Sequence, residues 1–122
     1  MALDDRIQIE LKDGIVVITA LGELDLELCD EVRDHLAQTY PNIHRLWDFR
    51  KISINFAMDD VRAIAQNAKI MLPGMATRIA FVAGDELSFG VLRQYGTFRE
   101  EDGKSNVHVY RDFDEAAAWL RG

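Results

Sequence analysis

The sequence has only one cysteine and two prolines among its 122 residues. With Cys29 alone, no disulfide can form within the chain, and this favours a reducing compartment. No apolar run approaches the roughly 20 residues that a membrane-spanning helix needs. The acidic start of the chain, MALDDRIQIE, does not resemble a signal peptide. We therefore expect a cytoplasmic protein without a membrane span.

Positive charge is also scarce. The chain has 14 lysines and arginines against 21 aspartates and glutamates, a formal net charge of -7. Binding to nucleic acid needs a basic stripe that neutralises phosphates. The one cationic grouping is Arg45, Arg50 and Lys51, and it is diluted by Asp48. We expect no nucleic-acid partner and no simple electrostatic adhesion to anionic lipid.

Motifs of catalysis and metal binding are missing as well. No HExxH or CxxC spacing places ligands on one face, and the three histidines are far apart in the sequence. No GxSxG, Walker or GxGxxG motif is present. The adjacent Asp59 and Asp60 have a simpler explanation than acid–base chemistry, because carboxylates at a helix start are stabilised by about 0.3–1 kcal/mol each. We expect no enzyme, no metal and no cofactor.

The residues that are present predict a single domain of alternating strands and helices. The composition, 48% hydrophobic and 29% charged, is ordinary for a globular protein. Alternating or short apolar segments predict strands at 6–11, 15–22, 44–49, 78–84 and 106–111. Helical spacing predicts helices at 25–40, 59–72, 85–95 and 112–120.

Local signals support these elements. Asp13 and Gly14 are residues that tolerate the positive φ angles of a tight hairpin turn. Asp112, with Glu115 three residues later, has the spacing of a capping box. Gly90 weakens the helix that it lies in.

The order β-β-α-β-α-β-α-β-α indicates an α/β fold. We expect a mixed, mostly parallel sheet of about five strands, with an N-terminal antiparallel hairpin and about four helices. Open α/β sheets bind ligands beyond the carboxyl ends of their strands. The corresponding loops are Asp48–Asn55 and Ala83–Leu87.

Two apolar regions have alternative interpretations. Met71, Leu72 and Met75 are soft side chains of the kind that adaptable binding surfaces use. A helix end packed on the core is the simpler explanation, and we favour it. Trp119 and Leu120, in the closing helix, are expected in the core.

The whole pattern, from Arg6 to Leu120, resembles the STAS domain group, and more closely its SpoIIAA-like branch of single-domain relatives of anti-sigma-factor antagonists. The resemblance is carried by LWDFRKIS after the first helix, RIAFVAGDE in the middle and VYRDFDEAAAWL at the end. It implies a regulatory domain of the fold described above.

In anti-sigma-factor antagonists, a partner kinase phosphorylates a serine or threonine at the start of the helix after the strand that RLWDF resembles. The phosphate adds about −1.5 to −2 charges to a docking surface. Aligning Asp48 with the strand-end aspartate of that group places Ala57 and Met58 at the acceptor position. Ser53, the only hydroxyl in the loop, lies several residues too early. The resemblance therefore implies the interaction module without its phosphorylation switch.

These observations leave three hypotheses. The first is a non-catalytic regulatory module that binds a protein partner through the loop before Asp59 and the helix that follows. The alternative is a binding domain for an apolar small molecule or lipid, using the region of Met71 and Met75. An enzyme would need a shifted carboxylate, for instance Asp48 or Asp85. A homodimer through Phe56 and Met58 is a further expectation. The candidate binding residues are Asp48, Ser53, Asn55, Met58, Asp59, Asp85, Met71 and Met75.

Overall fold

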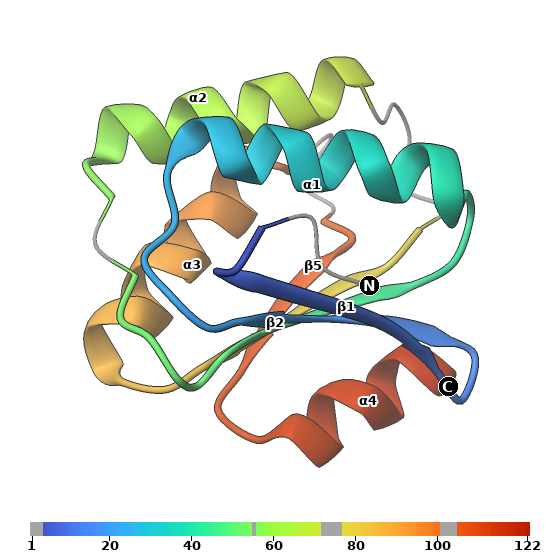
Figure 1. Cartoon of the computed structure of the whole chain (residues 1–122). Helices are drawn as coiled ribbons and strands as arrows, with labels where there is room; N and C mark the ends of the chain where they lie inside the picture. Colours follow the sequence, from blue (N-terminus) through green and yellow to red (C-terminus); the bar gives the residue numbers. More distant parts are fainter. Residues whose placement is uncertain (1–3, 55, 72–76, 101–104) are drawn as a thin grey trace.

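The computed structural model describes residues 4–54, 56–71, 77–100 and 105–122. One five-stranded sheet separates two layers of helices (Figure 1). The strands are β1 Ile7–Lys12, β2 Ile15–Ala20, β3 Arg45–Phe49, β4 Ile79–Ala83 and β5 Val107–Tyr110. The helices are α1 Leu26–Thr39, α2 Met58–Met71, α3 Glu86–Phe98 and α4 Phe113–Arg121.

The hairpin that opens the chain forms as expected. β1 pairs antiparallel with β2, and the turn between them has Asp13 at φ 51° and Gly14 at φ 85°. Two consecutive residues with positive φ give the backbone twist that matches paired strands. The remaining pairs, β2 with β3, β3 with β4 and β4 with β5, are parallel. The predicted mixed, mostly parallel sheet is confirmed.

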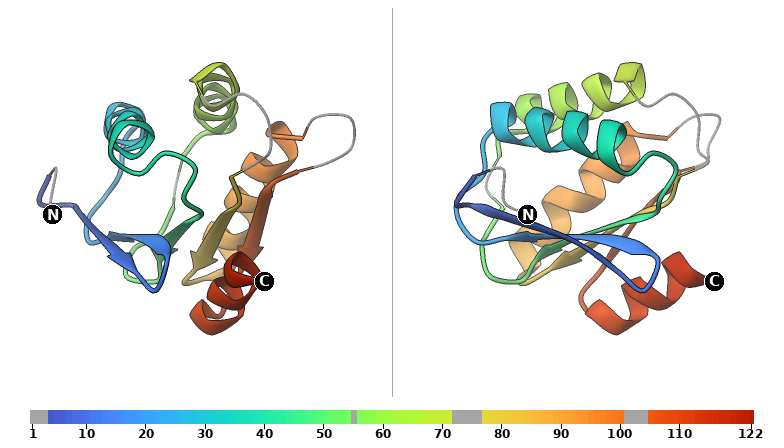
Figure 2. Two further views of the ribbon diagram at one scale, coloured as in Figure 1. Left: turned by 90° about the vertical axis from the view of Figure 1, so that its right-hand side faces the viewer. Right: turned by 45° about the vertical axis from the view of Figure 1, so that its right-hand side comes forward.

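The strands follow one another across the sheet in chain order, β1-β2-β3-β4-β5. Right-handed crossovers that all advance in one direction place their helices on the same face. Accordingly, α1, α2 and α3 cover one face, and α4 lies on the other (Figure 2).

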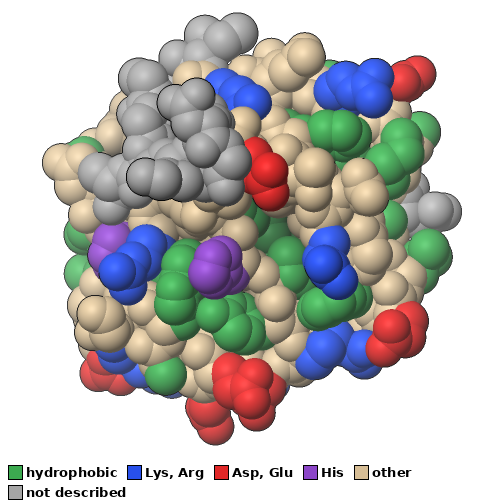
Figure 3. Space-filling model, turned by 180° about the vertical axis from the view of Figure 1, so that it is seen from behind, with side chains coloured by type: hydrophobic (Ala, Val, Ile, Leu, Met, Phe, Trp, Pro, Cys, Tyr) green, Lys and Arg blue, Asp and Glu red, His purple; other side chains and the backbone are tan. Residues whose placement is uncertain are grey.

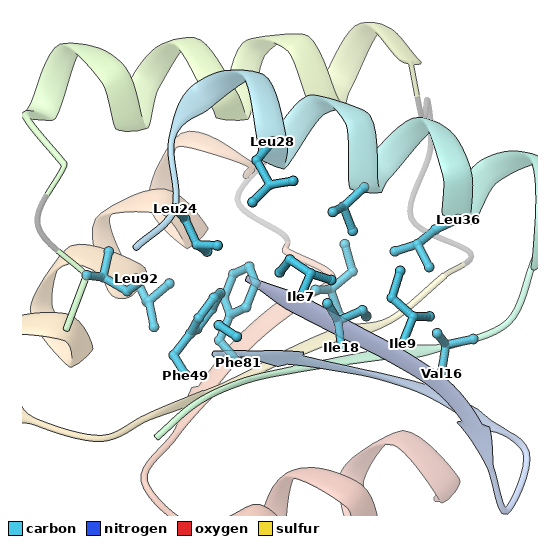
Figure 4. Packing of buried hydrophobic residues seen from close by; sticks show 14 of the residues in the cluster. Ile7, Ile9, Val16, Ile18, Leu24, Leu28, Leu36, Phe49, Phe81 and Leu92 are labelled. Atoms are coloured by element: carbon cyan, nitrogen blue, oxygen red, sulfur yellow. The ribbon is translucent and has the colours of Figure 1, made fainter. Parts of the chain in front are cut away.

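Alternation along the strands gives the two faces separate cores. Val16, Ile18, Phe49 and Phe81 belong to the larger core, beneath α1 and α3. Figure 4 shows Leu28 and Leu36 pointing from α1 toward Ile7, Ile9 and Ile18 of the sheet. The smaller core, under α4, consists of Ile15, Val17, Leu46, Ala80, Val82, Ala116, Ala117 and Leu120.

The helices differ in how closely they approach the sheet. α3 packs against β4 and β5, and α4 packs against β2 to β5, whereas the close backbone neighbours of α2 are α1 and α3. Between Met58 and Lys69, the part of α2 whose burial is described, the buried side chains are short or medium in length: Val61, Ile64, Ala65 and Ala68. Such a helix leaves space between itself and the strands below it.

Three details differ from the sequence-based expectation. α3 continues to Phe98, three residues beyond the predicted end, because Leu92 and Gly96 keep it packed on the sheet despite Gly90. α2 begins at Met58, one residue before the predicted start, and its predicted end at residue 72 lies outside the described residues. Trp119 is only half-buried, since its ring stacks on exposed His108 with centroids 4.1 Å apart, while Leu120 is in the core as expected.

Candidate functional site

A cavity of about 80 Å³ lies between the sheet and the layer formed by α1, α2 and α3. This volume is several times the ~10–15 Å³ that a single water requires. Most of its wall is apolar, and the exceptions are guanidinium groups. The lining residues are Leu24, Cys29, Arg33, Arg45, Trp47, Phe49, Ile54, Phe56, Val61, Ile64, Ile79, Phe81, Val91, Leu92, Tyr95 and Arg99.

The two ends of the cavity differ in chemistry. At the carboxyl ends of the strands the wall contains Phe49, Ile54 and Phe56. Figure 4 shows Leu24, Phe49, Phe81 and Leu92 gathered at this end of the core. Arg45 begins β3 and therefore lies at the opposite, amino end. The cavity is thus apolar at one end and cationic at the other.

A surface groove of about 240 Å³ adjoins the apolar end. Leu24, Ile54 and Phe56 line both the cavity and the groove. The groove also contains Glu23 and Ser53. Movement of the shared side chains would join the cavity to the groove at this edge of the sheet.

Three arginines at the cationic end are almost completely buried: Arg33 is 6% exposed, Arg45 3% and Arg99 4%. Arg33 donates from Nη1 to the carbonyl of Ile64, 3.1 Å away, and pairs through Nη2 with Asp30. Arg99 donates from Nη1 to the Tyr95 hydroxyl at 2.8 Å. Arg45 Nε is buried without a hydrogen-bond acceptor among the described residues, and no described carboxylate acts on the charge of Arg45.

Burial changes the titration of groups in the cavity wall. It lowers the pKa of Arg33 and of Arg45, and the neighbouring guanidinium groups lower that of Arg45 further. Burial also raises the pKa of Cys29 to about 11. Cys29 is therefore a thiol near neutral pH.

The two loops expected to hold the site do meet at the carboxyl edge of the sheet. The Ser53 hydroxyl donates to Asp85 Oδ2 at 2.5 Å. The backbone N–H of Ile54 donates to Ser88 Oγ at 2.8 Å, and the N–H of Ser88 donates to Asp85 Oδ1. Asp85 is therefore the N-cap of α3 and an anchor for the preceding loop, and these hydrogen bonds lower its pKa.

Replacing Ser88 with alanine is expected to lower the free energy of unfolding by about 1–3 kcal/mol, because the buried N–H of Ile54 loses its acceptor. Urea denaturation measures this loss. Ser53→Ala is the control, since it removes an exposed hydroxyl from the same pair of loops. An equal loss in both variants would show that the buried hydrogen bond from Ile54 to Ser88 contributes no more to stability than the exposed one from Ser53 to Asp85.

Asp48 lies on the other side of the sheet from the cavity. It is in phase with Leu46, and its carboxylate accepts hydrogen bonds from the Arg50 side chain at 2.9 and 2.8 Å. Arg50 in turn lies over the Phe113 ring of α4, 5.0 Å from its centroid. Burial alone would raise the pKa of Asp48, but the bonds from Arg50 outweigh burial and lower it. Asp48 thus connects β3 to the α4 layer.

The other candidate residues are distributed around the start and end of α2. Met58 and Asp59 begin this helix and are exposed. Met71 is its last residue. The side chain of Met71, together with Asn55 and Met75, lies outside the described residues, so the proposed Met71/Met75 region remains a prediction.

The buried arginines were not among the candidates from the sequence. One signal was present: Arg45 is in phase with Trp47 and Phe49, which places a charge on the inward face of a strand. Arg50 and Lys51, grouped with Arg45 in the sequence, are exposed. The cationic grouping is thereby divided between the interior and the surface.

Other classes of site have little support in the described part of the chain. It contains no cluster of three metal-ligating side chains. None of its helices combines the length and the apolar character needed to cross a bilayer. Figure 3 shows basic, acidic and apolar side chains interspersed on the face seen from behind, rather than a continuous basic stripe.

No protein-family profile and no curated protein matches the chain. Solved structures do match its fold. An uncharacterized protein of the DUF3478 family with a SpoIIAA-like fold, from Shewanella loihica PV-4, is 19% identical with a TM-score of 0.59, covering 93% of this chain and 91% of its own. The protein TM1081 is 19% identical with a TM-score of 0.58, covering 93% and 86%. The chain therefore has the SpoIIAA-like fold that its sequence pattern indicated.

Proposed function

We propose that this protein is a non-catalytic binding domain for a small apolar molecule, held in the cavity between the sheet and α1 to α3. The observation that carries the proposal is the apolar-lined cavity and the three side chains that it shares with the surface groove. Apolar pockets bind apolar ligands because their walls offer few hydrogen-bond partners to water. The proposed ligand site is this cavity, whereas the sequence had suggested the region of Met71 and Met75.

A catalytic role is not part of the proposal. The two carboxylates considered for acid–base chemistry, Asp48 and Asp85, both have lowered pKa values. A general acid near neutral pH needs a raised value instead. Both carboxylates also have their oxygens engaged by neighbouring groups.

The fluorescence of Trp47, which lines the cavity, tests the proposal. In a Trp119→Phe background, where Trp47 is the only indole, titration with 1-decanol is expected to change the emission and to saturate. Val91→Phe places a ring into the cavity wall and should weaken binding at least tenfold. Leu87→Phe, which adds the same ring to an exposed position of α3, should not. Equal affinities in the two variants would exclude the cavity as the site.

A protein-interaction role is the second candidate, in keeping with the resemblance to anti-sigma-factor antagonists. It is favoured by Met58 and Leu87, which are 42% and 60% exposed at the starts of α2 and α3. The acceptor position holds Ala57 and Met58, and Ser53 is already bonded to Asp85. We propose that such an interface would work without phosphorylation. Sedimentation equilibrium tests self-association, and a monomer at high micromolar concentration would exclude the dimer.

A further inference from the structure

Arg45 presents a buried charge on which no acidic group among the described residues acts. On the two adjacent strands, the residues that pair with Arg45 are Val16 and Ile79, and both are aliphatic. The groups that act on its charge are the cations of Arg99 and Arg33 and the hydroxyl of Tyr95. A buried charge without a partner opposes folding strongly, and nearby like charges add to that effect.

The other two arginines have structural explanations. Arg33 joins α1 to the backbone of α2 through the Ile64 carbonyl, and it pairs with Asp30. Arg99 is the C-cap of α3, and its guanidinium group donates a hydrogen bond to the Tyr95 hydroxyl one turn earlier. Neither explanation extends to Arg45, whose Nε is enclosed without an acceptor in the described structure. The described residues thus leave Arg45 Nε without an acceptor, and an anion in the cavity would supply one.

We infer that the cavity binds an amphipathic carboxylate, with its carboxylate group on Arg45 and its apolar tail directed toward Phe49, Ile54 and Phe56. This inference rests on the proposed function and adds the class of ligand. A guanidinium group presents its N–H donors in a planar fork that matches the two oxygens of a carboxylate. Arg33 and Arg99 add positive charge at the same end of the cavity.

The geometry also indicates the size of the ligand. Arg45 and Phe49 are the first and last residues of β3. At about 3.3 Å per residue, the two ends lie about 13 Å apart. An extended acyl chain of the length of decanoate is of this order. The cavity of about 80 Å³ is too small to hold all of it, since an engineered cavity of about 150 Å³ holds benzene, so the tail would extend past the shared side chains into the groove of about 240 Å³. The carboxylate end would lie deep in the molecule, and the tail would face the shared wall of the groove.

Calorimetric titration with decanoate and 1-decanol at pH 8, where the carboxylate is ionised, tests the inference. The wild-type protein is expected to bind decanoate at least tenfold more tightly than decanol. Arg45→Met should abolish this preference while retaining decanol binding, and Arg45→Gln provides a second neutral variant. Arg93→Met removes an exposed arginine of α3 and should leave the preference unchanged.

The outcomes separate this inference from the proposed function. Equal affinity for the two probes in the wild-type protein, or a preference that persists without Arg45, would overturn the carboxylate site and leave apolar binding intact. Binding of neither probe would overturn both proposals. Decyl phosphate binding more tightly than decanoate would replace the carboxylate with a phosphate head group.

Discussion

Replacing Phe81 with alanine is expected to lower the free energy of unfolding by about 3–5 kcal/mol. Phe81 is buried, and its ring contacts those of Trp47, Phe49 and Tyr95 at centroid distances of 5.3 to 6.5 Å. The loss should fall toward the lower limit, because one side of the ring already borders the cavity and has fewer packing partners to lose. Urea denaturation of the ligand-free protein measures the change.

The same substitution should also alter ligand binding, because it enlarges the cavity. Leu46→Ala is the matched control: Leu46 is fully buried, but it belongs to the core under α4. Its expected loss of about 2–5 kcal/mol is similar. Only Phe81→Ala should allow a longer alcohol, such as 1-dodecanol, to bind as tightly as 1-decanol. Identical ligand preferences in the two variants would contradict the position assigned to the cavity.

Replacing Arg45 with methionine is expected to raise the free energy of unfolding of the ligand-free protein, by about 1–4 kcal/mol. Exchanging buried ionic groups for apolar residues of similar volume has stabilised other proteins by this amount. The gain should be present throughout pH 5–9, because a guanidinium group stays protonated across that range even with its pKa lowered by burial. The urea midpoint without added ligand measures the effect.

Arg33→Met is the control for this second prediction. Arg33 makes a hydrogen bond to Ile64 and an ion pair with Asp30, and both are lost in the variant. Its stability should therefore fall, or rise less than that of Arg45→Met. Destabilisation of Arg45→Met would mean that its charge has a partner in the ligand-free protein, and it would remove the physical basis for an anionic ligand.

The fold could be predicted from the sequence because its local signals agree with one another. Alternation identified the strands, helical spacing identified the helices, and Asp13 and Gly14 identified the hairpin turn. Asp112 acts as the N-cap of α4, accepting from the backbone N–H of Asp114. Helix ends were less accurate, as α3 shows, because tertiary packing outweighs the weak helix propensity of a single glycine.

The site was predicted only in part, for a topological reason. The loops containing Ser53 and Asp85 do meet at the carboxyl edge of the sheet, as expected. A crevice between them would require crossovers that leave the sheet on opposite faces. Here the first three helices share one face, so the space lies beneath the helices instead. The alternation along β3 predicts that Arg45 points inward. It does not predict whether the guanidinium group finds a partner, because the surrounding side chains are distant in the sequence.

The order of the strands also has a consequence for how the chain folds during synthesis. From β2 onward, each strand pairs with the strand that precedes it in the sequence. From β2 onward, each strand has its first partner already formed, and each parallel pair is closed by one crossover that contains a single helix. The sheet can therefore grow strand by strand from the N-terminus as the chain leaves the ribosome. α4 would then cover the second face last, after β5 has completed the sheet.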